Sequence, residues 1–126
     1  MNAPLSPLQI ADSLTELWSP QVIAEVDDMY VKVAKVKGEL AWHAHEQEDE
    51  LFFILRGEFT LEFEYGRVTL RAGEMFVVPR GKRHHPIAKE ECLLLLLERK
   101  STAHTGGEVT SQTKSIADQL RWLTSR

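Results

Sequence analysis

The sequence has a single cysteine, no long apolar run and no large excess of either charge. One cysteine, Cys92, cannot form an intrachain disulfide, and in its apolar surroundings it is most simply a small buried side chain. The longest apolar run, residues 92–97, is far shorter than the roughly 20 residues that cross a bilayer. We therefore expect a fold without disulfides and no membrane partner.

The charge balance does not favour nucleic acid as a partner. The formal net charge is −4, and the local group of cations, Arg80, Lys82 and Arg83, is typical of a solvated loop. Residues 1–7 have neither the basic start nor the apolar stretch of a signal peptide. Together with the lone cysteine, this favours a reducing, cytoplasmic location.

Short apolar segments separated by glycine and proline dominate the middle of this 126-residue chain. Such segments predict strands. Because no long crossover helix lies between them, the pattern favours an all-β fold, an antiparallel sandwich or barrel, over a parallel sheet. The pattern predicts strands from residue 22 to residue 44, the clearest being residues 30–36, where interleaved lysines indicate a half-exposed strand. The other predicted strands are residues 51–55, 59–63, 68–70, 75–78 and 92–97.

Three of these strands carry specific expectations. Gly38 should end the first strand. Residues 51–55 are apolar on both faces and should be buried on both sides. Strict alternation in the next strand places Phe59, Leu61 and Phe63 inward.

A short amphipathic helix is expected near the N-terminus. Ser6 can act as the N-cap and Pro7 can take the first helical position. Apolar residues then recur at helical spacing as far as Leu17, and Pro20 should mark the end of the helix.

A second helix is expected over residues 115–123, with Ser115 as its cap and Ile116, Leu120 and Leu123 on one apolar stripe. The preceding residues are polar and should form a loop. We expect one domain with three segments: an N-terminal helical segment (1–20), a β-barrel (21–100), and a C-terminal loop and helix (101–126).

Two histidines two residues apart form the first half of a candidate metal site. On a strand, His43 and His45 would point to the same side, so both imidazoles can enter one cavity. Glu50 shares a face with Phe52, and a carboxylate buried there needs a strong partner such as a metal. Asp49 is the competing carboxylate, but it would alternate onto the opposite face.

His84 completes the candidate site from a turn shaped by Pro79 and Gly81. Its neighbour His85 should point to the opposite face, because adjacent strand residues alternate. Three imidazoles and one carboxylate suit a divalent first-row metal, and Zn, Fe, Mn and Ni all accept such ligands. The predicted metal ligands are His43, His45, Glu50 and His84.

These two segments resemble the conserved motifs of the cupin superfamily. The first motif is a glycine, His-x-His, a glutamate and a closing glycine, which are here Gly38, His43, His45, Glu50 and Gly57. The second is a glycine, Pro-x-Gly and a histidine, which are here Gly73, Pro79, Gly81 and His84. The chain departs from the pattern in a shorter spacing before His43 and in Ala88, where the family often has asparagine.

The resemblance implies a small jelly-roll β-barrel, one domain per chain, with the metal ligands inside it. It also implies a homodimer and a small-molecule ligand. We expect apolar side chains to line the barrel, with Phe52, Phe59, Leu61, Phe63 and Phe76 as candidates.

The leading hypothesis is a metal-dependent isomerase, dioxygenase or lyase that acts on a small polar metabolite such as a sugar or a carboxylate. The alternatives are a non-catalytic binding or sensing domain and, more weakly, a structural protein with a vestigial site, because fold alone does not choose a function. The motifs offer no obvious general acid or base. Glu48, Asp49 and His85 are the nearby titratable groups, and the catalytic residues stay unassigned.

Overall fold

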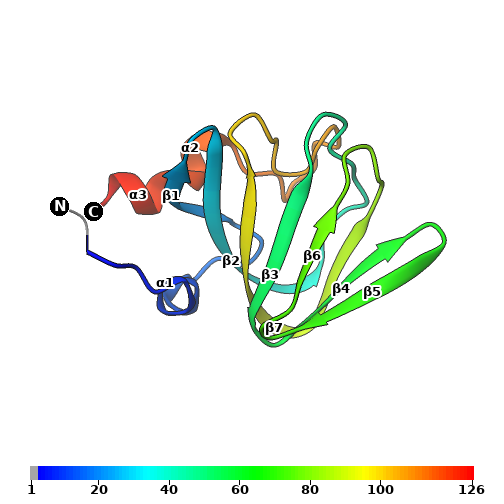
Figure 1. Ribbon diagram of the computed structural model, residues 1–126, viewed down its shortest axis with the longest axis horizontal. Helices are drawn as coiled ribbons and strands as arrows, with labels where there is room; N and C mark the ends of the chain where they lie inside the picture. Colours follow the sequence, from blue (N-terminus) through cyan, green and yellow to red (C-terminus); the bar gives the residue numbers. More distant parts are fainter. Residues whose placement is uncertain (1–2) are drawn as a thin grey trace.

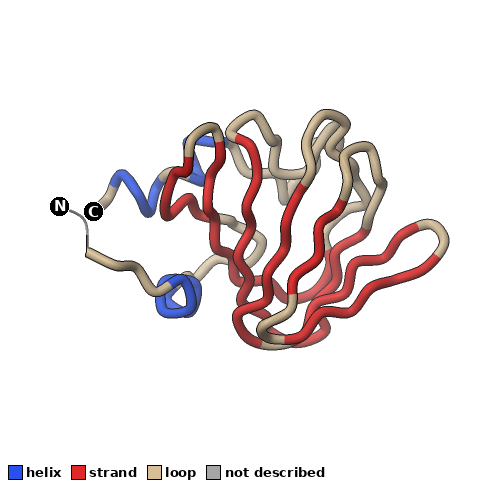
Figure 2. The backbone as a smooth tube through the Cα atoms, viewed as in Figure 1, coloured by secondary structure: helices blue, strands red, loops and turns tan. Residues whose placement is uncertain are grey.

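The computed structural model describes residues 3–126, where a strongly bent antiparallel sheet carries its short helices together on one side (Figures 1 and 2). Residues 1 and 2 of the predicted N-terminal segment lie outside the described residues. No helix of the described part is long and apolar enough to span a membrane. The elements are α1 (Pro7–Ser13), β1 (Gln21–Val26), β2 (Met29–Glu39), β3 (Glu50–Arg56), β4 (Glu58–Phe63), β5 (Gly66–Arg71), β6 (Met75–Val78), β7 (His85–Arg99), α2 (Ile116–Gln119) and α3 (Arg121–Thr124).

Strand β7 organises the sheet. It pairs with β2 along one side, and on its other side it pairs first with β4 and then with β3. The strand order is β1-β2-β7-β3-β6, and β5 extends the sheet beyond β4 as a hairpin that projects at the right of Figure 1. The predicted antiparallel all-β fold with short terminal helices is confirmed, although the hydrogen bonds among residues 3–126 do not close it into a complete barrel.

The sheet bends between β3 and β4 at Gly57. This residue has φ +92°, and a Cβ there would lie 2.9 Å from the carbonyl oxygen of Glu91 and 3.2 Å from the Cα of Cys92 on β7. Glycine adopts this left-handed backbone without steric cost and leaves room for the close approach. The bend therefore lets β3 and β4 both stay beside β7.

The main apolar core lies inside the bend. Phe59 and Leu61 are fully buried there, as the alternation predicted, while Phe63 is half-buried against the same cluster. Cys92 also lies in this core, and burial raises the pKa of its thiol to about 12, so it is a packing residue. A smaller cluster on the outer face of the sheet packs α1 against β1, β2 and β7, through Ala11, Ile23, Val33 and Leu93.

Two strand predictions were wrong in detail. Gly38 does not end β2, which continues to Glu39; Gly38 lies instead at a shift in the register against β7, with φ +88°. Strand β3 is not buried on both sides, because Phe52 and Ile54 are buried while Leu51, Phe53 and Leu55 are only half-buried. On the outer face of β3, Leu55 packs against the cluster that contains Ala11 of α1. The N-terminal segment therefore covers this face only in part.

The helix boundaries also differ from the prediction at the N-terminus. Ser6 caps α1 as expected, accepting a hydrogen bond from the backbone N–H of Gln9 at 3.2 Å. The helix ends at Ser13 rather than near Pro20, because Leu14 turns to an extended backbone. Leu17 then forms an isolated β-bridge to Lys35, so it belongs to the sheet and not to the helix.

The predicted C-terminal helix over residues 115–123 is two short helices, α2 and α3, with the break at Leu120. Ser115 caps α2 as predicted and accepts from the N–H of Asp118 at 3.1 Å. Ile116, expected on the apolar stripe, is 45% exposed, whereas Gln119 is buried. The polar contacts of Gln119, and not the apolar periodicity of the segment, therefore decide which side chain is buried.

Gly57 and Gly73 offer a matched test of the bend. Their φ values are +92° and +86°, but a Cβ on Gly73 would meet nothing within 4 Å. We expect Gly73→Ala to lower the free energy of unfolding by about 1–2 kcal/mol through backbone strain alone. Gly57→Ala should cost at least about 1 kcal/mol more, because β7 must also shift. Urea unfolding measures both, and equal losses would contradict the close packing at Gly57.

Candidate metal centre

The four predicted ligands converge from three parts of the chain. His43 and His45 lie in the loop after β2, Glu50 begins β3, and His84 immediately precedes β7. One ligand atom from each residue lies within 4.8 Å of the others, and all four side chains are buried. The structure therefore brings together the whole predicted set, and metal binding by it stays a prediction.

Backbone hydrogen bonds join the two motifs directly. The N–H of His43 donates to the carbonyl of His84 at 3.0 Å, and the N–H of His84 donates to the carbonyl of His43 at 2.8 Å. This is an isolated bridge rather than the strand predicted for the His-x-His segment. The expected alternation still holds, because His43 and His45 are buried while Ala44 between them is half-buried.

Two of the imidazoles are held in a defined orientation by backbone carbonyls. Nδ1 of His43 lies 2.7 Å from the carbonyl oxygen of Ala41, and Nδ1 of His84 lies 2.9 Å from that of Lys82. Because a carbonyl oxygen only accepts, each Nδ1 carries the proton of the neutral ring. Each Nε2 therefore presents its lone pair, which is the usual arrangement of a metal-ligating histidine.

Two distances between ligand atoms fit a bound cation. Oε1 of Glu50 lies 3.3 Å from Nε2 of His45 and 3.4 Å from Nε2 of His84. Ligands about 2.1 Å from a metal lie about 3.0 Å apart in an octahedron and about 3.4 Å apart in a tetrahedron. None of these three buried atoms has a hydrogen-bond partner within residues 3–126. Leaving each unpaired costs about 1–3 kcal/mol, which a cation at their centre would relieve.

The electrostatics of the cluster also suit a cation. Burial, followed by the neighbouring His84, lowers the pKa of His43 to about 4, so this ring is neutral at neutral pH. Burial would raise the pKa of Glu50, but its contacts with His45 and His84 outweigh burial and hold it well below the usual range. Burial opposes protonation of His45, yet the adjacent Glu50 outweighs it and raises the pKa of that ring.

The two neighbours that could have replaced a ligand point elsewhere. Asp49 is exposed and its Oδ1 accepts from the backbone N–H of Arg80 at 2.9 Å. His85 faces outward, where Nδ1 lies 3.0 Å from Glu62 and the ring stacks on Trp42. The structure thus places Glu50 and His84 in the cluster and Asp49 and His85 outside it, and the role of Glu50 and His84 as ligands stays a prediction.

A second buried carboxyl lies behind Glu50. Glu98 on β7 is directly opposite Glu50 in the β3–β7 ladder and is 2% exposed. Nζ of Lys32 lies 2.6 Å from Oε1 of Glu98 and donates to Oε1 of Gln119, also at 2.6 Å. Burial and the charge of Glu50 raise the pKa of Glu98, and Lys32 opposes them.

Sequence reasoning missed this network because the lysines of β2 indicated a half-exposed strand. The alternation of inward and outward residues along the strands could have indicated that these two charged side chains are buried. Lys32 shares the inward face with Ala34 and Val36, and Glu98 shares the inward face with Leu94 and Leu96. A charged residue that alternates onto the same face of a strand as buried apolar residues is therefore a candidate for a buried ion pair.

A cavity of about 30 Å³ lies between the ligands and the core. Its polar lining consists of His43, Glu50 and His104, and sequence reasoning did not single out His104. Of the five predicted lining residues, Phe52 and Phe59 do line the cavity, while the other three pack within or against the core. Its apolar walls are Trp18, Pro20, Ala34, Val36, Leu40, Phe52, Phe59, Pro86, Leu94 and Leu96.

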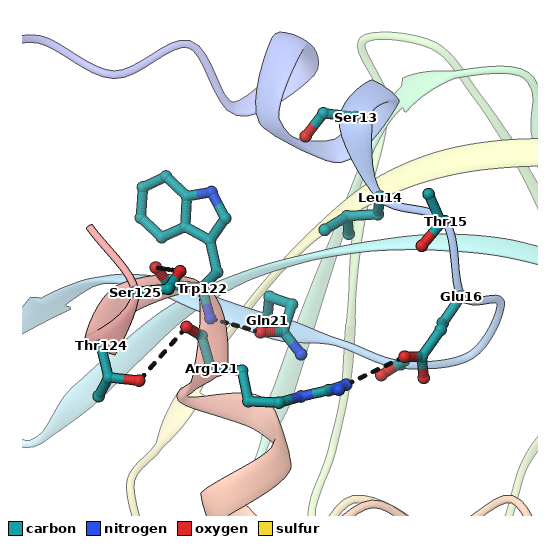
Figure 3. Close-up of a pocket in the computed structure, with 10 residues that line it drawn as sticks. Ser13, Leu14, Thr15, Glu16, Gln21, Arg121, Trp122, Thr124 and Ser125 are labelled. Atoms are coloured by element: carbon teal, nitrogen blue, oxygen red, sulfur yellow. Dashed lines mark hydrogen bonds and ion pairs between the residues drawn. The ribbon is translucent and has the colours of Figure 1, made fainter.

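A larger hollow, of about 550 Å³, lies between the end of α1 and the C-terminal helix α3 (Figure 3). It is crossed by an ion pair of 3.3 Å between Arg121 and Glu16. At its floor, Oε1 of Gln21 accepts from the backbone N–H of Trp122 at 2.9 Å. This hollow shares no residue with the metal-ligand cluster, so the smaller cavity is the better candidate for chemistry.

Metal affinity should depend on the protonation of His45. Its pKa is raised above the ordinary 6.5, so metal-free protein near that pH carries a proton that an ion must displace. Because of this ring alone, the apparent metal affinity should fall about tenfold for each pH unit below the raised pKa of His45. Above that pKa the affinity should level off. His43, with a pKa of about 4, contributes only in more acid solution. Competition titrations with a chelator from pH 8 to 5 measure this, and a flat profile would contradict ligation by His45.

The buried ion pair of Lys32 and Glu98 makes a prediction about the stability of variants. Lys32→Met leaves Glu98 buried without its cation and should lower the free energy of unfolding by about 3–5 kcal/mol. Adding Glu98→Met should recover most of that loss, because two apolar side chains replace the pair. Lys35→Met, on the half-buried face of the same strand, is the control and should change little. Urea unfolding compares the variants, and equal effects at Lys32 and Lys35 would rule out a buried pair.

Comparison with known proteins agrees with this architecture. The chain is 33% identical over 94 residues to the uncharacterized protein YdbB of Bacillus subtilis, covering 74% of this chain and 83% of that protein. It superposes on the crystal structure of a cupin-2 domain protein from Shewanella frigidimarina with a TM-score of 0.74 and 40% identity, over 76% of this chain and 94% of that one.

A more distant relative carries the name of an enzyme. The chain is 25% identical over 108 residues to 3-hydroxyanthranilate 3,4-dioxygenase 2 of Aspergillus fumigatus, covering 81% of this chain but spanning only 50% of that protein. The family defined by the Cupin domain matches residues 29–98, which include all four candidate ligands. This chain therefore belongs to the cupin family.

Proposed function

We propose that this chain is a metal-dependent enzyme acting on a small polar metabolite such as a sugar or a carboxylate. One divalent metal ion would be held by His43, His45, Glu50 and His84. The observation that carries the proposal is the convergence of buried ligand atoms that have no partner within residues 3–126. A small-molecule ligand and a homodimer belong to the same proposal.

A bound metal would supply a Lewis acid for a substrate oxygen or, as iron, a redox centre for dioxygen. Residues of the chain orient the side chains that would hold this metal. The carbonyls of Ala41 and Lys82 orient the rings of His43 and His84. Four protein ligands leave one or two positions of a five- or six-coordinate ion for a substrate atom.

The surroundings of the site strengthen its electrostatics. Apolar walls make up most of the cavity beside His43 and Glu50, and charge interactions are larger in such a low-dielectric space. Glu98 can hold a proton beside Glu50, because burial and the charge of Glu50 raise its pKa. The site thus offers a proton-holding carboxyl that the motifs did not reveal.

Among the reaction types, the dioxygenase type has support from a relative. The Aspergillus fumigatus protein that matches 81% of this chain is named as a dioxygenase of an aromatic carboxylate, 3-hydroxyanthranilate. The chain spans half of that protein, so the relative supports the reaction class and leaves its substrate open. Isomerase and lyase chemistry remain within the proposal because they use the same ligand set.

A non-catalytic binding or sensing role is the second candidate. Asp49 and His85, two of the titratable groups expected near the motifs, face away from the cluster. The third, Glu48, accepts a hydrogen bond from the hydroxyl of Ser101 at 3.1 Å. A site without these acids and bases is suited to holding a ligand. Recovery of a stabilising metabolite unchanged would favour this role over turnover.

Metal analysis tests whether the chain binds a metal, which both the enzyme and the binding or sensing role require. Protein purified without chelators or a histidine-rich tag should carry about one first-row metal per chain. His43→Ala combined with His84→Ala should lose most of it, because two of four ligands are removed. His85→Ala is the matched control and should retain the metal, since this ring points away from the cluster. Unmodified protein that contains no metal and rebinds none would refute the proposal.

A further inference from the structure

The segment after β7 crosses the end of the sheet where the ligand loop lies, as the orange part of the ribbon shows (Figure 1). Gly106 is in direct contact with this loop, because a Cβ there would overlap the carbonyl oxygen of Ala44, the residue between His43 and His45. Gly106 also has φ +57°, which favours glycine. The segment therefore rests on the backbone of the metal motif itself.

Several side chains fix this segment in place. Thr105 is fully buried and its hydroxyl lies 2.6 Å from that of Thr113. Gln112 donates to the carbonyl of Glu39 at 3.1 Å, and Gln119 accepts from Lys32 at 2.6 Å. His104 directly precedes Thr105, and its ring accepts a hydrogen bond from the backbone N–H of Lys114. These contacts hold His104 at a defined position in the cavity lining.

The hydrogen bonding of His104 defines its tautomer. The ring lines the cavity together with His43 and Glu50. Its Nδ1 lies 2.9 Å from the backbone N–H of Lys114, which can only donate, so Nδ1 bears no hydrogen. Burial, then the charge of Lys32, lowers the pKa of His104 to about 4, so the ring is neutral and its hydrogen is on Nε2. The cavity residue His104 therefore has one donor to offer.

We propose that His104 is a ligand-contacting residue, whose Nε2–H donates a hydrogen bond to one oxygen of a small carboxylate bound beside the metal ligands. The inference rests on the proposed function and narrows its substrate class. A carboxylate has one oxygen for a metal and a second for a neutral donor such as Nε2–H. His104 thus provides, from outside both sequence motifs, a contact that selects the ligand.

The cavity walls favour a carboxylate over a sugar. All lining residues other than His43, Glu50 and His104 are apolar. The volume of about 30 Å³ has room for about two water molecules, which is close to the size of a carboxyl group. A polyol would bury several hydroxyls without partners against these walls, at about 1–3 kcal/mol for each one.

Two isosteric substitutions separate the contact from a merely structural role. In His104→Asn the amide oxygen occupies the place of Nδ1, so it can still accept from Lys114, but no donor reaches the place of Nε2. In His104→Gln the amide nitrogen reaches the place of Nε2, but the acceptor for Lys114 is lost. A structural role therefore predicts damage from Gln and little from Asn, while the proposed contact predicts the reverse for ligand affinity.

The experiment uses the full chain loaded with Co²⁺ and titrated with acetate, followed by the visible absorption of the metal. We expect His104→Asn to keep the cobalt affinity and the melting temperature but to bind acetate about tenfold more weakly. His104→Gln should bind acetate within about threefold of the unmodified chain while melting at a lower temperature. Glycerol, as the polyol probe, should bind more weakly than acetate.

Each contrary result has a distinct meaning. Unchanged acetate affinity in cobalt-loaded His104→Asn would overturn the role of His104 and leave the proposed metal function standing. Glycerol binding as tightly as acetate would overturn the carboxylate assignment. Failure of the unmodified chain to bind Co²⁺ would refute the proposed function, and the inference would fail with it.

Discussion

Three buried polar atoms set the constraint on which the rest of the structure depends, because none has a hydrogen-bond partner in the described part of the chain. They are Nε2 of His45, Nε2 of His84 and Oε1 of Glu50. All three atoms are buried, so solvent water does not hydrate them. Such atoms are tolerated in a fold only where something else compensates for their lost hydration. The bend at Gly57 and the ladder of β7 place the side chains so that one cation can compensate all three.

A second set of charged side chains lies behind the candidate metal ligands. Glu98 stands opposite Glu50, and Lys32 connects Glu98 to Gln119 of the C-terminal segment. One cationic side chain thus offsets part of the negative charge that two neighbouring carboxyls would otherwise concentrate in the core. The arrangement also links the ligand set, through β2 and β7, to the segment that carries His104.

Local rules predicted those features that local geometry decides. Alternation placed Phe59 and Leu61 in the core and separated Glu50 from Asp49, and capping chemistry located the starts of α1 and α2. Features decided by distant partners were not predictable in this way. The buried state of Lys32 depends on its contact with Gln119, 87 residues along the chain. His104 likewise lines a cavity with His43 and Glu50, which are distant in the sequence, and a single sequence does not specify such neighbours.

The reciprocal backbone hydrogen bonds between His43 and His84 have a consequence for ion exchange. They hold two ligands from separate motifs together whether or not an ion is present, so the ordering entropy of these loops is already lost when the chain folds. An ion can then leave and another enter without the barrel having to refold. If the proposed site binds a metal, preorganisation of this kind would leave the identity of that metal to the supply of ions in the surroundings as much as to the protein.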